Sequence, residues 1–312
     1  MDNFIASLNV VLPLFIMMSL GSFIRIVGIL DEEMTYKMNA FTFKVLLPIF
    51  LFTNIYNNEL DKTYNWKLVV FSVISIIILY LILWFIIPLI DDDNRRRSVI
   101  IQGIYRSNFI IFGIAVCTSL FGESSAGSTA IMTIIIVPLF NILAVFTLES
   151  YRKDSGGLSN IIKGIVLNPL IIASILGIII NFIGIKFPTA VEKTLSDISK
   201  TATPLALMIL GASFKFSSIS KYFRQLTISV VGKLIIVPAL FIPLSILMGF
   251  RDVELITLIS IFGAPTSVSS FTMAQQMDAN SELASQIVVF TSLISIITMF
   301  GWIFITKQIG VI

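Results

Sequence analysis

Long apolar stretches separated by short polar links dominate the chain. A bilayer core of about 30 Å takes about 20 mostly apolar residues per helix. Ten stretches satisfy that length, at residues 4–26, 35–56, 66–90, 97–120, 127–148, 161–184, 195–214, 223–249, 253–276 and 283–306. None of them alternates at every second position, as the strands of a membrane barrel do. The pattern predicts an all-α polytopic membrane protein with ten transmembrane helices.

The composition supports this class and excludes several others. Hydrophobic residues make up 56% of the 312 positions and charged residues only 12%, against about a quarter charged in soluble domains. A single cysteine, Cys117, allows no intramolecular disulfide, and the absence of histidine removes the usual zinc ligand and general base. The net charge of +3 is too small for a nucleic-acid footprint. We expect no cofactor, no metal and no enzymatic activity.

The start of the chain is unlike a signal peptide. Residues 1–4 contain Asp2 and no Lys or Arg, and the apolar run continues past Ile24. We therefore expect this segment to remain in the mature protein as its first span.

The distribution of Lys and Arg between the links predicts the orientation. With the N-terminus outside, the inner links hold eleven basic residues: Arg25, Lys37, Arg95, Arg96, Arg97, Arg152, Lys153, Lys163, Lys215, Lys221 and Arg224. The outer segments hold seven: Lys62, Lys67, Lys186, Lys193, Lys200, Arg251 and Lys307. We expect a cytoplasmic-membrane protein with both termini outside.

The second half of the chain resembles the first. At an offset of 156 residues, Val10–Ile29 aligns with Val166–Ile185 without a gap, and nine of the twenty positions are identical. The same offset places Pro48 on Pro204. Two five-helix repeats are expected, covering residues 1–156 and 157–312. Because five is odd, the second repeat crosses the membrane in the opposite sense, an arrangement typical of secondary transporters that work by alternating access.

Two spans contain polar runs that predict broken helices. In the fourth span, Arg106, Ser107 and Asn108 precede a run that ends at Gly113. In the ninth span, Gly263, Ala264, Pro265, Thr266 and Ser267 begin the most polar intramembrane run of the chain. Inside a helix, Ser and Asn side chains compete with the backbone for hydrogen bonds. A helix must kink or restart at proline, and we expect Pro265 to be the first residue of the restarted helix. These nine residues are the candidate substrate site.

The two breaks favour an anionic substrate. Helices that restart present free N–H groups and the positive end of their dipole, which attract anions. Arg106 adds a charge with the geometry to bind a carboxylate, although pairing with backbone carbonyls at the break is an equal alternative.

Six further residues are candidates for hinge or pocket positions. Pro48 is followed by Thr53 and Asn54, and Pro204 is followed by Gly211. Lys233 lies within a span, where its ammonium either reaches an interface or opposes the charge of the site. For Lys44, also within a span, an interfacial position is expected, and for Asn141 a hydrogen bond between helices.

Acidic residues lie in links or at span ends, as at Asp91–Asp93, Glu149, Asp278 and Glu282. A proton-coupled mechanism therefore lacks an obvious carrier. An anion that leaves an inside-negative cell gains about 2.3 kcal/mol per charge per 100 mV, so export needs no second ion. Sodium coupling through the 263–270 run stays open, as do proton coupling and a homodimer.

Five segments resemble the auxin efflux carrier family, in its bacterial membrane-transport branch. They are Leu47–Phe52, Arg106–Gly113, Asn168–Ile171, Pro204–Ala212 and Ala264–Met277. The resemblance implies two inverted five-helix repeats, a scaffold and a transport domain, and broken fourth and ninth helices that cross. By matching position, Asn108 is the family's polar residue at the first break and Pro265 its proline at the second. Family members carry organic anions, auxin in plants and malate- or malonate-like dicarboxylates in bacteria.

The sequence thus predicts a carrier of a small organic anion, either secondary active or driven by the membrane potential. A sodium-coupled symporter of organic acids is the first alternative. A membrane-embedded enzyme lacks a base to activate a nucleophile, and a sensor lacks a soluble domain.

Overall fold

The computed structural model describes residues 2–57, 65–122, 125–152 and 158–312, and every regular element in these ranges is helical. Lys62 and Lys153, which the sequence places in links, lie outside the described residues. The elements of the first half are α1 (Asp2–Ile26), α2 (Glu32–Phe41), the π-helical turn η1 (Thr42–Leu46), α3 (Leu47–Asn57), α4 (Trp66–Ile90), α5 (Asn94–Tyr105), α6 (Phe109–Phe121) and α7 (Ala126–Ser150).

Helices also make up the second half of the chain. Its elements are α8 (Leu158–Val166), α9 (Pro169–Ile183), α10 (Thr189–Ser213), α11 (Ser218–Lys221), α12 (Phe223–Val231), the π-helical turn η3 (Gly232–Ile236), α13 (Val237–Leu247), α14 (Asp252–Gly263), α15 (Ser269–Gln276) and α16 (Ser281–Gln308).

Residues of the polar links start several of the helices. The side chains of Asp31, Asn65, Asp93, Asn168 and Asn280 each accept a hydrogen bond from a backbone N–H in the first turn of the helix that follows. Such N-caps satisfy donors that have no partner inside the helix. The short links of the sequence therefore determine where α2, α4, α5, α9 and α16 begin.

Among the described residues, six helical segments are long and apolar enough to cross a membrane. They are Glu32–Asn57, Trp66–Ile90, Asn94–Phe121, Ile131–Ser150, Phe223–Leu247 and Ser281–Gln308, and two shorter apolar helices are Val11–Ile26 and Pro169–Ile183. The predicted spans 195–214 and 253–276 are not among them. The first forms part of α10, whose N-terminal half is charged, and the second is divided between α14 and α15.

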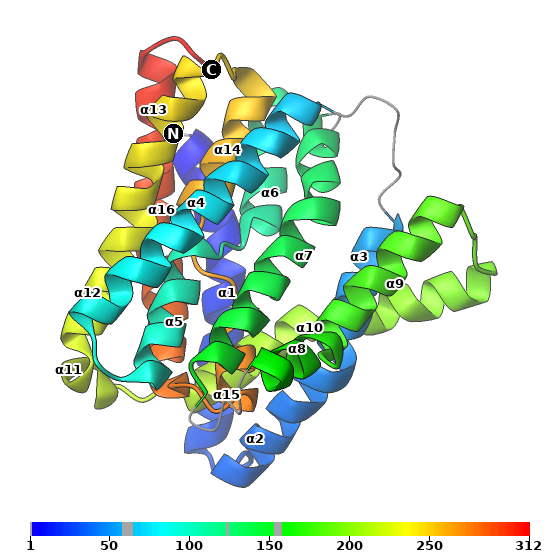
Figure 1. Cartoon of the computed structure of the whole chain (residues 1–312), viewed down its shortest axis with the longest axis vertical. Helices are drawn as coiled ribbons and strands as arrows, with labels where there is room; N and C mark the ends of the chain where they lie inside the picture. Colours follow the sequence, from blue (N-terminus) through cyan, green and yellow to red (C-terminus); the bar gives the residue numbers. More distant parts are fainter. Residues whose placement is uncertain (1, 58–64, 123–124, 153–157) are drawn as a thin grey trace.

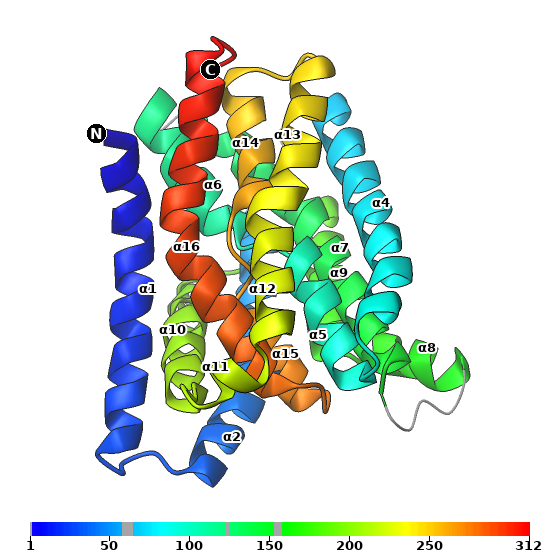
Figure 2. The same ribbon diagram turned by 90° about the vertical axis from the view of Figure 1, so that its left-hand side faces the viewer.

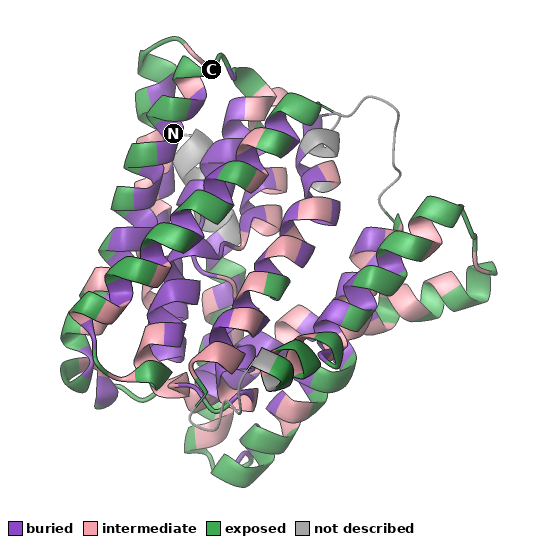
Figure 3. Ribbon diagram, viewed as in Figure 1, coloured by how far each residue is buried: buried purple, intermediate pink, exposed green. Residues whose placement is uncertain are grey.

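The helices form two groups that meet along α1 and α7 (Figure 1). One group contains α3, α9 and α10, and the other contains α4 to α7 and α12 to α16. Large apolar side chains on α4 and α9 are exposed, among them Ile74, Phe85, Leu89, Leu176 and Phe182. Both helices carry many exposed positions (Figure 3). An exposed apolar surface of this extent suits contact with lipid tails.

Helices α1 and α10 touch through their backbones. A side-chain carbon placed on Gly21 would overlap the carbonyl of Met208, and one placed on Gly211 would overlap the carbonyl of Met18. The hydroxyl of Ser22 also donates a 2.7 Å hydrogen bond to the carbonyl of Gly211. Glycine at both positions allows the close approach that small residues give to membrane helices.

The start of α1 and the end of α16 lie at the same end of the molecule (Figure 2). A cluster of charged side chains occupies the opposite end, where Glu32 of α2 pairs with Arg25 and Lys215, and Lys215 also pairs with Glu282 of α16. These ion pairs are partly exposed, and each contributes at most about 1 kcal/mol. They connect the two groups of helices at this end.

Candidate functional site

The fourth predicted span is broken where the polar residues predict it. Helix α5 ends at Tyr105 and α6 begins at Phe109. Arg106 is extended, with φ −80° and ψ 136°, and Asn108 stands at the N-cap of α6. The prediction of an interruption between residues 105 and 109 is confirmed.

The ninth predicted span is also broken, but its second helix begins further along the chain than predicted. The prediction placed Pro265 at the first position of that helix. Helix α14 ends at Gly263, and α15 begins only at Ser269. Ala264 is extended, with φ −66° and ψ 154°, as the residue before a proline tends to be. The expectation that Pro265 starts the second half-helix is wrong, because residues 264–267 lie outside any helix and α15 begins only after its N-cap, Val268.

The two links are hydrogen-bonded to each other. The backbone N–H of Asn108 donates a 2.8 Å bond to the carbonyl of Pro265. The hydroxyl of Thr266 donates a 2.6 Å bond to the carbonyl of Gly103, in the last turn of α5. Buried backbone groups that have left a helix require such partners. The broken segments therefore meet and stabilise each other inside the protein.

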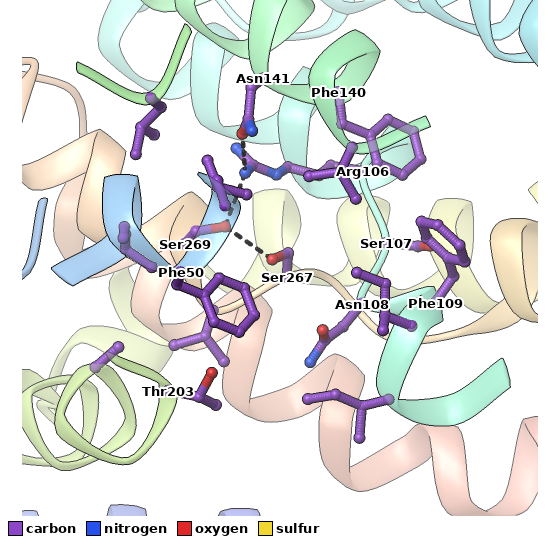
Figure 4. A pocket seen from close by; sticks show the side chains of 18 residues that line it. Phe50, Arg106, Ser107, Asn108, Phe109, Phe140, Asn141, Thr203, Ser267 and Ser269 are labelled. Carbon is purple, nitrogen blue, oxygen red and sulfur yellow. Dashed lines mark hydrogen bonds between the residues drawn. The ribbon is translucent and has the colours of Figure 1, made fainter. Parts of the chain in front are cut away.

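Arg106 is buried next to this junction, with 4% of its surface exposed. Its Nη2 donates to Asn141 Oδ1 at 2.6 Å and to Ser269 Oγ at 2.8 Å (Figure 4). Its Nη1 lies 2.8 Å from the sulfur of Met273. All three partners are neutral. Among the described residues, no carboxylate pairs with this guanidinium.

A pocket that is partly open to the outside lies in front of Arg106; its empty space of about 760 Å³ includes the part open to solvent. Polar groups line part of its wall, and apolar side chains of α3, α6, α7, α9 and α10 line most of the rest. The lining residues are Leu47, Phe50, Leu51, Arg106, Ser107, Asn108, Phe109, Ile110, Ile111, Val137, Phe140, Asn141, Leu170, Thr203, Ala206, Ser267, Val268 and Ser269. Of the nine predicted substrate residues, Arg106, Ser107, Asn108 and Ser267 line this pocket.

Asn108 and Ser267 present polar groups to the same space (Figure 4). The side chain of Asn108 makes no capping hydrogen bond to α6, so its amide is available to a ligand. The hydroxyl of Ser267 shares a 2.8 Å hydrogen bond with that of Ser269, which in turn accepts from Arg106. The pocket therefore offers an amide, two hydroxyls and a guanidinium from two different broken helices.

The other five predicted substrate residues lie behind the pocket wall. Gly263, Ala264, Pro265 and Thr266 belong to the buried backbone of the second break. Gly113 lies inside α6, where an added side-chain carbon would be 2.7 Å from Thr129 Cγ2. Thr266 holds the junction through Gly103, and Gly113 allows α6 to pack against α7 and α14.

The six predicted flanking residues also lie outside the pocket lining. Pro48 is the second residue of α3, directly after η1, and Pro204 is inside α10. Thr53 is buried, and Asn54 donates to the carbonyl of Phe50 at 2.9 Å. Gly211 forms the contact with α1, and Lys233 is enclosed in η3.

Sequence reasoning missed most of the apolar wall. Phe50 of α3, Phe140 of α7 and Thr203 of α10 line the pocket from three separate helices. No sequence signal distinguishes the two phenylalanines from lipid-facing ones. Asn141 had a signal, since it is a lone amide in an apolar span, and its interpretation as an interhelical hydrogen-bonding residue is confirmed by its contact with Arg106.

The arrangement suits a small anion with an apolar body. Helices α6 and α15 both begin at the junction, and their N-terminal ends bring partial positive charge to it. The guanidinium adds a full charge, and Phe50, Phe109 and Phe140 offer apolar contact. Within the described ranges, no group of three or more Cys, Asp or Glu side chains is placed to hold a metal ion.

Comparison with known proteins gives relatives along nearly the whole chain. A Methanothermobacter thermautotrophicus protein named "Uncharacterized transporter" is 24% identical over 305 residues, which cover 96% of this chain and 98% of the relative. A Rhizobium meliloti protein named "Putative malonate transporter" is 22% identical, with 96% of each chain covered. The Escherichia coli protein named "Uncharacterized transporter YfdV" is 21% identical, with 96% of this chain and 97% of the relative covered.

A family profile matches as well. The family described as "Membrane transport protein" matches residues 6–303, which include both broken helices and every residue of the pocket. This match confirms the resemblance seen in the five sequence segments. Membership in a family of membrane transport proteins implies a transporter rather than an enzyme. The chain belongs to the membrane transport protein family, which is that of the auxin efflux carriers.

Proposed function

We propose that the protein carries a small organic anion, a carboxylate or dicarboxylate, across the cytoplasmic membrane. The observation that carries this proposal is the guanidinium of Arg106, which is buried in the pocket wall with neutral partners only. A buried charge is costly unless it is paired. A bound carboxylate would supply the missing negative charge.

The remaining polar groups suit the same ligand. Asn108 and Ser267 line the same pocket as Arg106 and offer further hydrogen-bond donors to a bound anion. Charge-assisted hydrogen bonds of this kind are about twice as strong as neutral ones. The relative named "Putative malonate transporter" makes malonate the first compound to test.

Alternating access is the mechanism that we propose for the transport step. The helices fall into two successions of five predicted spans, and the fourth of each is broken. These features support two inverted repeats, residues 1–156 and 157–312, with the substrate held at the junction of the broken helices. The basic residues of the predicted inner links, such as Arg25, Arg96 and Lys215, support termini that lie outside.

Anion flux into proteoliposomes tests this proposal. Purified protein is reconstituted, a membrane potential is imposed with potassium and valinomycin, and the uptake of radiolabelled malonate is measured. Arg106→Gln removes a charged hydrogen-bond donor worth about 1.5–3 kcal/mol, so uptake at low malonate should fall about 10- to 150-fold. Arg224→Gln, which removes an exposed arginine at the start of α12, is the matched control.

The uptake results separate the possible readings. Loss of uptake in Arg106→Gln with normal uptake in Arg224→Gln supports the proposed site. Equal uptake in both variants would remove Arg106 from the site. Failure of the unaltered protein to move any carboxylate in a panel of mono- and dicarboxylates would contradict the proposed function itself.

A further inference from the structure

One cation serves the whole pocket. Of the eighteen residues that line it, eleven are apolar. Six more are polar without charge: Ser107, Asn108, Asn141, Thr203, Ser267 and Ser269. Among the described lining residues, Arg106 is therefore the only one with a charge. A pocket of this composition offsets one negative charge of a ligand, and a second negative charge finds no cation in its wall.

The hydrogen-bonding capacity of Arg106 points to the same limit. A guanidinium has five N–H donors. Both N–H groups of Nη2 are occupied, one by Asn141 Oδ1 at 2.6 Å and the other by Ser269 Oγ at 2.8 Å. One N–H of Nη1 is directed at the sulfur of Met273, which lies 2.8 Å away. At most two donors therefore remain for a ligand, which suffices for the two oxygens of one carboxylate.

The polar groups near Arg106 form one connected part of the wall. Hydrogen bonds join Arg106 to Asn141 and to Ser269, and Ser269 to Ser267 (Figure 4). The remaining wall is mainly apolar, and its side chains come from several helices. They include Phe50 of α3, Phe109 of α6, Val137 and Phe140 of α7, and Leu170 of α9. A ligand whose carboxylate meets Arg106 thus has mainly apolar side chains available to the rest of its body.

A second carboxylate on the ligand is costly in this setting. Burial of a charge without a counter-charge is unfavourable. The amide of Asn108 and the hydroxyl of Thr203 are able to donate hydrogen bonds, but they supply no positive charge. An apolar group in the same place is favourable, because it removes its own surface and that of Phe50 or Phe140 from water. The same wall therefore disfavours a second charge and favours a hydrocarbon body.

We propose that the pocket selects monocarboxylates with a branched apolar body over dicarboxylates of the same size. This inference rests on the proposed function, because it concerns the substrate of the same site. Malonate still binds through one carboxylate, but more weakly, since its second carboxylate has no cation to pair with. One carboxylate and one guanidinium leave the occupied site without net charge, which suits a site enclosed within a bilayer.

Calorimetry with two ligands of matched shape tests the proposal. The pair is malonate and 3-methylbutanoate, in which two methyl groups replace the two oxygens of one malonate carboxylate. Each is titrated into the purified protein at a pH at which both carboxylates of malonate are ionised. We expect the Kd of 3-methylbutanoate to be at least about 10-fold below that of malonate.

A second cation in the wall should shift this preference toward malonate. Thr203→Lys places an ammonium on α10, at a position that lines the pocket. Its malonate Kd should fall about 10-fold, because the second carboxylate gains a charged partner, whereas 3-methylbutanoate should bind no more tightly than before. Thr203→Gln, whose side chain is long but neutral, is the matched control and should keep the preference for 3-methylbutanoate. The comparison in the unaltered protein needs no variant, so it decides the question even where Thr203→Lys does not fold.

The outcomes separate this inference from the proposed function. Tighter binding of 3-methylbutanoate, with a shift toward malonate in Thr203→Lys alone, supports the selection of monocarboxylates. A malonate Kd equal to or below that of 3-methylbutanoate in the unaltered protein would overturn it and leave the carrier function intact. Equal effects of Thr203→Lys and Thr203→Gln would overturn the role of this wall in the selection. Absence of binding for every mono- and dicarboxylate tested would overturn the proposed function as well.

Discussion

The backbone N–H of Asn108 donates a hydrogen bond of 2.8 Å to the carbonyl oxygen of Pro265. This bond joins the two places where the helical backbone is interrupted, one in each half of the chain. It leaves the side chain of Asn108 directed into the pocket (Figure 4). One residue therefore both closes the junction and contributes to the proposed binding site.

Replacing Asn108 with alanine should weaken anion binding without unfolding the protein. The side chain makes no capping bond to α6, so the fold loses little, whereas the ligand loses a polar partner. A buried polar group left without its partner costs about 1–3 kcal/mol, which corresponds to about a 5- to 150-fold rise in the malonate Kd, measured by calorimetry. Asn57→Ala, at the exposed end of α3, is the control. An unchanged Kd in Asn108→Ala would exclude its amide from the site.

Replacing Thr266 with valine should destabilise the junction itself. The change removes the 2.6 Å hydrogen bond to the carbonyl of Gly103 and leaves that buried carbonyl without this partner. We expect a loss of about 1–3 kcal/mol in stability, seen as a lower Tm of the detergent-purified protein. Thr227→Val, on the exposed face of α12, removes only a bond to Phe223 within its own helix. A Tm equal in the two variants would show that the bond to Gly103 contributes nothing.

Replacing Gly211 with alanine should separate α1 from α10. The new methyl group would overlap the carbonyl of Met18, and a backbone atom cannot move aside as a flexible side chain can. Overpacking of this kind typically costs about 1–3 kcal/mol. Gly301→Ala, inside α16 with no atom within 4 Å of the added carbon, should leave the Tm unchanged or slightly higher. Similar Tm values for both variants would argue against a tight contact between α1 and α10.

Asp91 should make the stability depend on pH in the acid range. Burial by itself raises the pKa of Asp91, but hydrogen bonds from Gln225, the N–H of Asp93 and Arg96 outweigh it, so the pKa lies below its ordinary value. A carboxyl whose pKa is lowered by folding stabilises the protein fully above its unfolded pKa of about 3.9. This contribution is lost as the pH falls through the lower folded pKa.

The comparison with Asp91→Asn measures that contribution. The Tm difference between the two proteins should be constant near neutral pH and shrink as the pH falls below about 4. Asp197→Asn, which removes an exposed carboxylate that pairs with Lys200 at 3.6 Å, is the control. A difference that stays constant down to pH 3 would show that the contacts of Asp91 do not favour its charged form.

Much of the architecture could be predicted because the membrane makes strong demands on composition. Polar residues inside an apolar span need partners, so Ser107, Asn108 and Thr266 marked the two breaks in advance. Asp31, Asn65 and Asp93 cap helices that begin at residues 32, 66 and 94, whereas the apolar pattern alone placed the starts at 35, 66 and 97. In these places, the local chemistry of a residue allows only a few backbone conformations.

The rest depends on contacts between distant segments. Phe50 and Phe140 line the pocket, but an apolar side chain suits lipid and a pocket wall equally well. The second break is longer than predicted, because the residues after Pro265 stay outside a helix until Ser269, and Thr266 among them bonds to Gly103 of α5, a contact between distant segments. The π-helical turns that hold Lys44 and Lys233 were not predicted, since the apolar pattern of a span does not distinguish them from α-helix.

The contact at Gly21 and Gly211 has a mechanical consequence. Two helices whose main chains touch cannot turn about their own axes or slide past each other without steric collision. Together they form a rigid pair of helices with a fixed separation. Any displacement that carries the junction of the broken helices toward one side of the bilayer must therefore occur at softer side-chain contacts, such as those that α1 makes with α6 and α16.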